Sequence, residues 1–378
     1  MAKVVVLGAG MIGNAMALDL AGEHQVTAVD ISKKALARLS KENDKISSIN
    51  YDLKDTDDYQ ALLADFDLVI CAVPGFMGFE TLKKILTAGK NVVDISFFPE
   101  NCFDLDYLAK KNNVTAVIDC GVAPGMSNVI LGYIDKKMEV DNYDCLVGGL
   151  PIKREWPFNY KAPFSPIDVI EEYTRPARYV ENSEVVTRDA LSDCELLEIK
   201  RVGTLEAFNT DGLRTLIHTM DHIPNMKEKT LRYPGHAEYI LVLLKSGFFS
   251  EQELEIDGTT FRPIDVTARI LKDNWQLKNS DDEFTVMRIT IEGDENGKQR
   301  RYIYRLLDKG CEQTKVTSMA RTTGYTATAI ANYVLQNKLE EGICAPEALG
   351  AIDGAYQFIL DYLQHRNVEY KIEEFTLD

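Results

Sequence analysis

Short apolar runs alternate with amphipathic stretches along the first third of the chain. The runs are rich in Val, Ile and Leu, and the segments between them have helical periodicity, which is the pattern of a parallel sheet covered by helices on both faces. The expected strands are Val4–Leu7, Val26–Asp30, Ile46–Tyr51, Leu68–Val73, Val92–Asp94 and Val114–Ile118. Strands joined by helical crossovers in this way predict a doubly wound α/β domain of the Rossmann type.

The regular alternation ends after Asp119. Between residues 143 and 307 the apolar runs follow no strand–helix–strand order, which predicts an α+β region with a mixed or antiparallel sheet. Its clearest element is a hairpin in which Phe284–Ile291 pairs with Arg301–Leu307 across the turn residues Gly293–Gly297. Two arginines, Arg288 and Arg305, interrupt the apolar alternation of these two strands.

The remaining segments are read from proline and small-residue patterns. Prolines from Pro151 to Pro176 predict a long irregular loop within the second region. After the hairpin, helices are expected over Thr322–Leu335 and from about Pro346 to Leu363.

The charge balance narrows the classes of partner. The chain has 42 Lys and Arg against 59 Asp and Glu, a formal net charge of -17, and an acidic surface repels the phosphates of nucleic acids and anionic membranes. No apolar run reaches the roughly 18 residues of a membrane helix, and the first residues lead into a strand rather than a signal peptide. We therefore expect a cytoplasmic protein with no nucleic-acid and no membrane partner.

Neither the cysteines nor the histidines form a metal-binding pattern. The 7 cysteines are scattered without a CxxC pair, so we expect reduced thiols. Only His218 and His222 have i, i+4 spacing, and no metalloprotease Glu stands between them. A protein-bound metal is not expected.

A glycine-rich turn follows the first strand. The segment Gly8-Ala9-Gly10-Met11-Ile12-Gly13 opens a helix, where backbone N–H groups and the positive helix end can hold a pyrophosphate. Gly8 permits the tight turn, Gly10 lets the pyrophosphate approach the backbone, and Gly13 lets the helix pack on the strand.

An acidic residue at the end of the second strand specifies the dinucleotide. Asp30 lies about 20 residues beyond the glycine turn, as the dinucleotide pattern requires. Its carboxylate can accept hydrogen bonds from both ribose hydroxyls and would repel the 2′-phosphate of NADP, although Lys33 and Lys34 lie nearby. We therefore expect the cofactor to be NAD.

Loops at the carboxyl ends of the later strands are further candidates for cofactor contact. Asp52 follows the third strand and could reach the adenine. Ala72, Val73 and Pro74 follow the fourth strand, and Ser96 follows the fifth, nearer the nicotinamide. Ordinary turns between strands and helices would give the same pattern at any one of these positions.

Several longer motifs resemble those of the saccharopine dehydrogenase family, and the likeness covers nearly the whole chain. Within the family, the chain is most similar to the lysine 6-dehydrogenases. The motifs are Gly121–Asn128, Gly148–Pro151, Leu205–Thr210, Thr230–Glu238 and Met319–Thr326.

The resemblance implies three parts of the chain. These are an NAD-binding Rossmann domain (1–122), an inserted α+β domain for substrate binding and dimerisation (123–320), and C-terminal helices that return to the first domain (321–378). Members of the family oxidise or form C–N bonds of amino acids or polyamines through an imine, and hydride passes to or from a nicotinamide.

Two departures from the saccharopine-forming members bear on the substrate. Those members carry Asn-Arg-Asp-Ser-Thr where this chain has Asn209-Thr210-Asp211-Gly212-Leu213, and Leu-Asp-Pro-Gly where it has Val122-Ala123-Pro124-Gly125. The missing arginine indicates a substrate with fewer carboxylates than saccharopine, because arginine binds a carboxylate through two parallel hydrogen bonds. The expected reaction is oxidative deamination of L-lysine at its terminal amine, giving the semialdehyde that cyclises to a piperideine carboxylate.

Amine oxidation needs a base, because only a neutral amine supports hydride loss and a free lysine amine titrates near about 10.4. His236 is the first candidate, since its ordinary pKa lies near neutrality. Glu206 could hold the substrate ammonium or share the base role, or instead form a structural ion pair with Arg232 or Arg321. Asp119, at the exit of the sixth strand, would line the cofactor side of the catalytic site.

Arg232 and Arg321 are also the candidates for binding the substrate carboxylate, although either could be a buried structural arginine. The residues expected to complete the pocket are Tyr233, Thr210, Asp211 and Thr322.

Two other functions remain open. Reductive C–N bond formation, as in saccharopine or carboxynorspermidine synthesis, would consume NADH only when an aldehyde and an amine are both present. A cofactor-binding sensor without turnover is the other, because Rossmann folds also serve such roles. We expect a homodimer, with the hairpin of residues 284–307 as one possible interface.

Overall fold

The computed structural model describes residues 1–54, 58–162, 166–278 and 281–377. The chain divides into two compact units, unit 1 with residues 1–137 and 319–369, and unit 2 with residues 138–318 and 370–378. These limits differ from the domains 1–122, 123–320 and 321–378 expected from the sequence. The helix after residue 125 belongs to unit 1, and the last strand belongs to unit 2.

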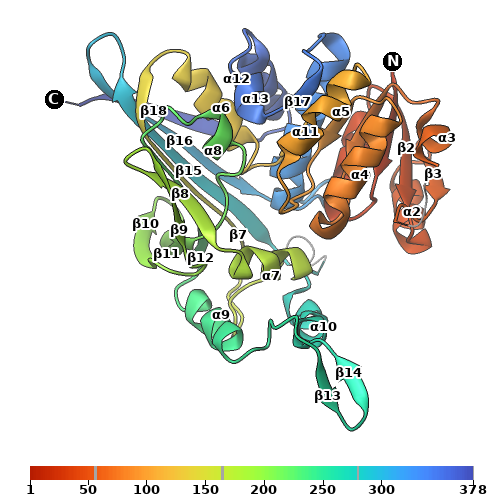
Figure 1. Cartoon of the computed structure of the whole chain (residues 1–378), viewed down its shortest axis with the longest axis horizontal. Helices are drawn as coiled ribbons and strands as arrows, with labels where there is room; N and C mark the ends of the chain where they lie inside the picture. The colour runs from red at the N-terminus through yellow and green to blue at the C-terminus, as the bar shows by residue number, and fades with distance from the viewer. Residues whose placement is uncertain (55–57, 163–165, 279–280, 378) are drawn as a thin grey trace. The chain divides into compact units, whose positions relative to one another are not determined.

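A parallel sheet forms the centre of unit 1, with strand order β17-β6-β5-β4-β1-β2-β3. All six strands expected from the sequence are present, which confirms the doubly wound fold. Figure 1 shows β2 and β3 beside helix α2 at one end of this sheet. The strands are β1 (Lys3–Leu7), β2 (Gln25–Asp30), β3 (Ser47–Asn50), β4 (Leu68–Cys71), β5 (Val92–Asp94), β6 (Thr115–Val117) and β17 (Gly342–Cys344).

The first helices of unit 1 connect these strands as crossovers. Apolar side chains of β1, β4, β5 and β6 are fully buried beneath them, and form the core of the unit with residues of α4 and α5. The elements are α1 (Met11–Leu20), α2 (Lys33–Glu42), α3 (Tyr59–Leu63), α4 (Gly75–Thr87), η1 (Cys102–Leu105), α5 (Asp106–Lys111) and α6 (Met126–Asp135).

The C-terminal helices return to unit 1, as expected. Helix α11 (Ser318–Gln336) confirms the first predicted helix. The second was wrong as a single helix, because α12 (Pro346–Gly350) and α13 (Ala355–His365) are separate, and Gly354 between them has a φ of +82°. Glycines hold α12 against α6. A Cβ at Gly132 would lie 1.9 Å from the carbonyl oxygen of Glu347.

The sheet of unit 2 is mixed, as expected. Its main strand order is β10-β11-β12-β7-β15-β16-β18, and β8 and β9 join beside β12. The long strands β7, β15 and β16 run side by side (Figure 1). The strands are β7 (Glu139–Pro151), β8 (Ala177–Glu181), β9 (Glu184–Arg188), β10 (Glu195–Ile199), β11 (Gly203–Asn209), β12 (Asn225–Arg232), β15 (Glu283–Asp294), β16 (Gln299–Lys309) and β18 (Tyr370–Thr376).

Strands β15 and β16 form the predicted hairpin. Asn296 and Gly297 turn the chain, and both have positive φ, +57° and +78°, as a tight hairpin turn requires. The hairpin does not lie at the edge of the sheet, since β15 also pairs with β7 and β16 also pairs with β18. Its backbone is therefore already paired on both sides, and only its faces could meet a second chain.

Helices and a small hairpin complete unit 2. The predicted loop between Pro151 and Pro176 contains helix α7, because Val169, Ile170 and Tyr173 recur at helical spacing and are buried. Proline is tolerated in the first helical turn, so the prolines did not exclude a helix here. The elements are α7 (Pro166–Thr174), α8 (Leu216–Thr219), α9 (His236–Lys245), β13 (Leu254–Ile256), β14 (Thr259–Phe261) and α10 (Pro263–Trp275).

Candidate functional site

The glycine turn of unit 1 has the geometry that the sequence predicts. Gly8 has a φ of +103°, and a Cβ there would lie 2.4 Å from the carbonyl oxygen of Ala72. A Cβ at Gly13 would lie 2.0 Å from the carbonyl oxygen of Gly8, so α1 and β1 approach as closely as backbones can. Gly10 is exposed, and among the described residues no atom lies within 4 Å of an added Cβ. The turn therefore offers open backbone at the N-terminus of α1, where an anionic group can bind.

The Asp30 carboxylate is held beside this turn. Its Oδ2 accepts the N–H of Ala9 at 2.6 Å and its Oδ1 accepts the N–H of Ser32 at 2.7 Å. The side-chain amide of Asn50 donates to the Asp30 carbonyl oxygen at 2.9 Å, which fixes the end of β2. The carboxylate is partly exposed. It stands where a group bound at the glycine turn would meet a fixed negative charge.

Three of the other predicted cofactor residues lie at the same edge of the sheet. The N–H of Tyr51 donates to the Asp30 carbonyl oxygen at 3.1 Å, which brings Asp52 beside the end of β2. The Ala72 carbonyl lies against Gly8, and exposed Pro74 immediately precedes α4. These contacts bring Asp52, Ala72 and Pro74 to the carboxyl edge of the sheet.

Val73 and Ser96 are buried instead. Ser96 is 2% exposed, its N–H donates to Asp94 Oδ1 at 2.8 Å, and its Oγ lies 3.5 Å from Cys71 Sγ. Its hydroxyl therefore faces the interior of unit 1, and Val73 packs in the core of the unit. The structure gives both residues a packing role.

A buried acidic pair lies at the carboxyl ends of β5 and β6. Asp94 has no exposed surface, and its Oδ2 has no hydrogen-bond partner among the described residues. Burial raises its pKa to about 7, and the charge of Asp119 adds to the rise. Asp119 is 4% exposed with a φ of +53°. Asp119 was predicted from the sequence as a site residue and Asp94 was not, although an acid that ends a Val-Val strand is a visible signal.

Arg232, on β12 of unit 2, is held by protein groups. Its Nε donates to Tyr173 Oη at 3.0 Å, its Nη2 pairs with Glu172 at 3.3 Å, and its Nη1 donates to the Leu231 carbonyl at 3.0 Å. The guanidinium also lies 4.7 Å above the ring of Tyr160 and is 4% exposed. Of the two roles left open by the sequence, this geometry favours the structural one.

His236, at the start of α9, has both ring nitrogens in hydrogen bonds. Nδ1 lies 2.9 Å from the carbonyl oxygen of Phe158, and Nε2 lies 2.9 Å from Tyr173 Oη. Because a carbonyl only accepts, we assign the ring proton to Nδ1, so that Nε2 accepts from the Tyr173 hydroxyl. Burial, with the nearby charge of Arg232, lowers the His236 pKa to about 3. This geometry does not support the expectation that His236 is the base, because the ring is enclosed and its acceptor nitrogen is used.

Glu206, on β11, is the more accessible acid of the predicted set. It stands directly opposite Arg232 across the two strands, and its Oε2 accepts the N–H of Gly235 at 3.2 Å. Within the described part of unit 2, Glu206 forms no ion pair with Arg232, whose charged partner is Glu172. Glu206 is half-buried, so its side chain is partly accessible to solvent.

Glu172, on α7, joins Arg232 to the predicted pocket residue Thr210 through Thr230. It is 19% exposed at its side chain and accepts a hydrogen bond from the hydroxyl of Thr230. Thr230 Oγ1 in turn lies 3.0 Å from Thr210 Oγ1. Glu172 was not predicted from the sequence, because its segment was expected to be a loop.

Two other predicted pocket residues of unit 2 are held by other groups. Asp211 forms a bidentate pair with Arg178, at 2.9 Å to Nε and 2.8 Å to Nη2. Tyr233 donates its hydroxyl to the Pro151 carbonyl at 2.8 Å, and the Arg154 guanidinium lies 4.0 Å above its ring. Both contacts order the surroundings of β11 and β12.

The two predicted residues of α11 lie inside unit 1. Arg321 is 7% exposed and donates to the carbonyl oxygens of Arg366 and Asn367 at 2.9 and 3.2 Å, which satisfies the end of α13. Thr322 has no exposed surface, and its hydroxyl points to the Met319 carbonyl at 3.4 Å. The structure therefore gives Arg321 a helix-capping role and Thr322 a packing role.

The described parts of the chain hold no group of three or more His, Cys, Asp or Glu side chains arranged to bind a metal. Within the same residues, no helix has both the length and the apolar character needed to cross a bilayer.

Two family models match the chain. The model of the saccharopine dehydrogenase C-terminal domain matches residues 121–368, which is more than half of the chain. The chain belongs to the saccharopine dehydrogenase family. The second model, the saccharopine dehydrogenase NADP binding domain, matches residues 4–117 and places a nicotinamide dinucleotide-binding domain in unit 1. Its description names NADP, whereas Asp30 predicts NAD.

Relatives within the family differ in how much of their length is shared. The mitochondrial alpha-aminoadipic semialdehyde synthase of Rattus norvegicus is 24% identical over 266 residues, 66% of this chain but only 29% of that protein. The chain thus spans less than a third of this relative. Carboxyaminopropylagmatine dehydrogenase of Synechocystis sp. is 22% identical over 367 residues, 90% of this chain and 91% of that protein.

A solved structure shares the fold over the full length. Saccharopine dehydrogenase (L-Glu forming) from Saccharomyces cerevisiae matches with a TM-score of 0.79 and 19% identity, covering 99% of this chain and 100% of that one. This likeness confirms the arrangement of a parallel Rossmann sheet and a second, mixed sheet.

Proposed function

We propose that the chain is an NAD-dependent oxidoreductase acting on the C–N bond of an amino acid, with the terminal amine of L-lysine as the first candidate. The observation that carries the proposal is the Asp30 carboxylate fixed beside the glycine turn, in a member of the saccharopine dehydrogenase family. A bound nicotinamide dinucleotide would supply the hydride acceptor.

The residues of unit 1 fit such a dinucleotide. Gly10 leaves backbone uncovered at the N-terminus of α1, and Asp30 presents a carboxylate at the adjacent strand end. A ribose with two free hydroxyls can donate to this carboxylate, whereas a 2′-phosphate would bring a second negative charge against it. This charge argument supports NAD over NADP.

In unit 2, two carboxylates could bind the amine of a substrate. Glu206 and Glu172 flank Arg232 and are both partly exposed. Such groups hold a substrate ammonium by charge, and one of them can take its proton before hydride loss. We assign the role of proton acceptor to Glu206, because Glu172 already interacts with both Arg232 and Thr230.

The side chain at position 210 supports a substrate with few carboxylates. Thr210 stands where saccharopine-forming members have an arginine, and its hydroxyl lies against that of Thr230, next to Glu172. The position therefore offers a hydroxyl group, with the Glu172 carboxylate nearby, in place of an arginine side chain that would attract a further carboxylate. Lysine, with one carboxylate and two amines, fits this set better than saccharopine does.

A second candidate reaction is hydride transfer at the C–N bond of a larger, substituted amine. The supporting observation is the alignment with carboxyaminopropylagmatine dehydrogenase, which covers nine tenths of both chains. In the reducing direction, this reaction would need an aldehyde together with an amine.

A substrate panel tests the two candidates. The purified full chain is mixed with NAD and, in separate reactions, with L-lysine, L-ornithine, saccharopine or carboxyaminopropylagmatine, and NADH absorbance is followed. We expect NADH with lysine. NADH only with a substituted amine would select the second candidate, while NAD binding by calorimetry without turnover of any amine would point to a sensor.

We also propose a homodimer. Helices α9 and α10 and the β13–β14 hairpin expose apolar side chains whose burial against a second copy would remove them from water. These side chains are Tyr239, Val242, Leu254, Ile256, Val266 and Ile270. Sedimentation velocity tests this, and we expect Ile256→Asp to shift the chain to the monomer while far-UV circular dichroism stays unchanged. A wild-type chain that is already monomeric would contradict the proposal.

A further inference from the structure

Three cationic side chains stand in one cross-strand row of the second sheet. Arg288 on β15 is directly opposite Arg305 on β16, and Arg305 is directly opposite Lys371 on β18. Like charges directly opposite each other destabilise a sheet. The positive charges of this row therefore repel one another, and a bound negative group would reduce this repulsion.

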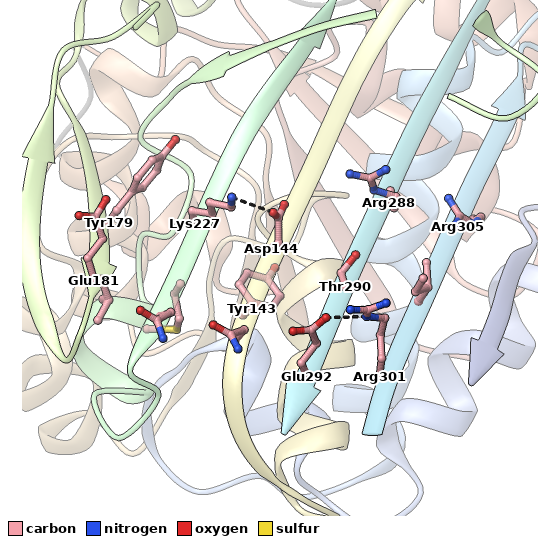
Figure 2. A pocket seen from close by; sticks show the side chains of 15 residues that line it. Tyr143, Asp144, Tyr179, Glu181, Lys227, Arg288, Thr290, Glu292, Arg301 and Arg305 are labelled. Carbon is pink, nitrogen blue, oxygen red and sulfur yellow. Dashed lines mark hydrogen bonds and ion pairs between the residues drawn. The ribbon is translucent and has the colours of Figure 1, made fainter. Parts of the chain in front are cut away.

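Two of these side chains line a depression in unit 2 with a volume of about 610 Å³. Figure 2 shows Arg288 and Arg305 on neighbouring strands, with Thr290 farther along the Arg288 strand. Because side chains two positions apart on a strand share a face, Thr290 presents its hydroxyl on the same side of the sheet as Arg288.

The acidic side chains that line the depression are all neutralised by their own cations. Each of the three forms an ion pair with a neighbouring strand residue, so none of them faces the Arg288 guanidinium as a free charge. The pairs are Asp144 with Lys227 at 3.1 Å, Glu292 with Arg301 at 2.5 Å, and Glu181 with Arg188 at 2.7 Å.

Among the described cationic side chains that line the depression, Arg288 is the one without an acidic partner. Arg305 has Glu373 of β18 as a partner at 3.2 Å. Arg288 is only partly exposed, yet no hydrogen bond, ion pair or ring contact joins it to any residue in the described ranges. A half-buried guanidinium with no partner inside a depression is a binding group for an anion.

We propose that Arg288 and Arg305 bind a small oxyanion, a phosphate or a carboxylate, in this depression. The planar guanidinium of Arg288 can donate two parallel hydrogen bonds to such a group, and the Thr290 hydroxyl can add a third donor. An anion bound to Arg288 adds an attraction there and offsets the repulsion between Arg288 and Arg305, which already has Glu373 as a partner. The site thus explains why an unpaired arginine interrupts an apolar strand.

This site is distinct from the acidic and hydroxyl groups that we propose for the substrate. Side chains of a strand alternate between the two faces of a sheet, so Lys227 of the depression lies on the opposite face of β12 from Thr230 and Arg232. The inference does not depend on the proposed function, because it concerns the other face of the sheet.

Anion binding is measured on the full chain at low ionic strength, by titration calorimetry and by thermal unfolding. The probes are sodium phosphate and sodium succinate, with sodium chloride at equal ionic strength as the reference. We expect one of the two oxyanions to bind and to raise the unfolding temperature beyond chloride. The two arms distinguish a phosphate site from a carboxylate site.

Variants locate the binding. Arg288→Gln should lower the affinity for the bound oxyanion at least about tenfold, since a hydrogen bond to a charged group contributes about 1.5 to 3 kcal/mol. Thr290→Val should lower this affinity less. The matched control is Arg269→Gln, because Arg269 is an exposed arginine of α10 that pairs with Asp273, outside the depression. Without an oxyanion, Arg288→Gln should unfold at the same temperature as the wild type or higher, because one repulsion is removed.

Three results would overturn the proposal. The first is that neither oxyanion binds to the wild-type chain or raises its unfolding temperature more than chloride does. The second is an equal loss in the Arg288 and Arg269 variants, which would mean general screening. The third is a change of oligomeric state in Arg288→Gln without probe binding, which would assign Arg288 to a contact with a second copy.

Discussion

The Nε2 atom of His236 lies 2.9 Å from the hydroxyl oxygen of Tyr173, whose hydroxyl in turn accepts a hydrogen bond from Arg232. The histidine thus continues a chain of hydrogen-bond donors that runs from Arg232 through Tyr173, and its own Nδ1–H is directed to the carbonyl oxygen of Phe158. This arrangement stabilises the neutral ring.

The first prediction concerns the stability of this neutral histidine. Its pKa is about 3 in the folded chain and near 6.5 in the unfolded chain, so below about pH 6.5 only the unfolded chain takes up the proton. The stabilisation is complete above that pH and is lost as pH falls toward 3, by up to roughly 5 kcal/mol. Urea unfolding at several pH values should show a weaker pH dependence in His236→Gln than in the wild type.

The same variant tests the role of His236 in activity. We expect folded His236→Gln to retain the acid limb of the kcat/KM profile, because this histidine does not titrate near neutrality. Loss of that limb, with the fold intact by circular dichroism, would restore His236 as the base.

The second prediction concerns cofactor choice. Asp30→Asn removes the charge that we propose to face the ribose, and we expect kcat/KM for NAD to fall about 10- to 100-fold, as lost charged hydrogen bonds of 1.5 to 3 kcal/mol imply. The ratio of NADP to NAD activity should rise, because the repulsion of the 2′-phosphate is gone. Exposed Asp44→Asn in the same unit is the control. A wild-type enzyme that already prefers NADP would contradict the assignment.

The third prediction concerns Glu206. Glu206→Gln keeps the shape and the hydrogen bond from Gly235 but cannot take a proton, so kcat should fall about 10²-fold or more. The acid limb of the pH profile should disappear with it. Exposed Glu238→Gln on α9 should leave both unchanged. If Glu206→Gln raised only KM, the carboxylate would hold the ammonium without acting as the base.

The fourth prediction separates Glu172 from Glu206. Glu172→Gln leaves the guanidinium of Arg232, which is 4% exposed, without its charged partner. Breaking a buried pair from one side costs about 3 kcal/mol or more, so the variant should lose stability in denaturant titrations. An unfolding midpoint equal to that of the wild type would show that Arg232 needs no such partner.

The fifth prediction concerns Asp94. Because its pKa is raised to about 7 in the folded chain, from 3.8, the folded chain binds the proton more tightly, and its contribution to stability decreases as pH rises from about 4 to 7. Asp94→Asn keeps an acceptor for Ser96 and removes this charge. Its stability relative to the wild type should be about 4 kcal/mol greater at pH 8 than at pH 4, at most. Exposed Asp65→Asn should show no such trend.

The sequence predicted the Rossmann strands because a strand buried on both faces reads as an unbroken apolar run, as in Val4–Leu7. Strand β17 was missed, because three residues form no pattern until β6 provides an edge. The break between α12 and α13 depends on the positive φ of Gly354. Because other glycines of this chain lie inside helices, a glycine at this position did not by itself predict a break.

The geometry of the glycine turn and of Asp30 was predictable because it depends only on the turn and the next strand. The partners of His236 were not, since Phe158 and Tyr173 lie more than 60 residues away in the chain. Likewise, Arg288 and Arg305 were visible as interruptions, but only the register of the hairpin shows that they stand directly opposite each other.

The chain crosses between its two units three times, after residues 137, 318 and 369. Strand β6 pairs with β17, and β16 pairs with β18, so each sheet takes its last strand from the final part of the chain. During synthesis from the N-terminus, neither sheet can be completed until that part has left the ribosome. A premature stop after residue 318 would therefore leave two open sheet edges instead of one intact unit, and we expect such fragments to aggregate.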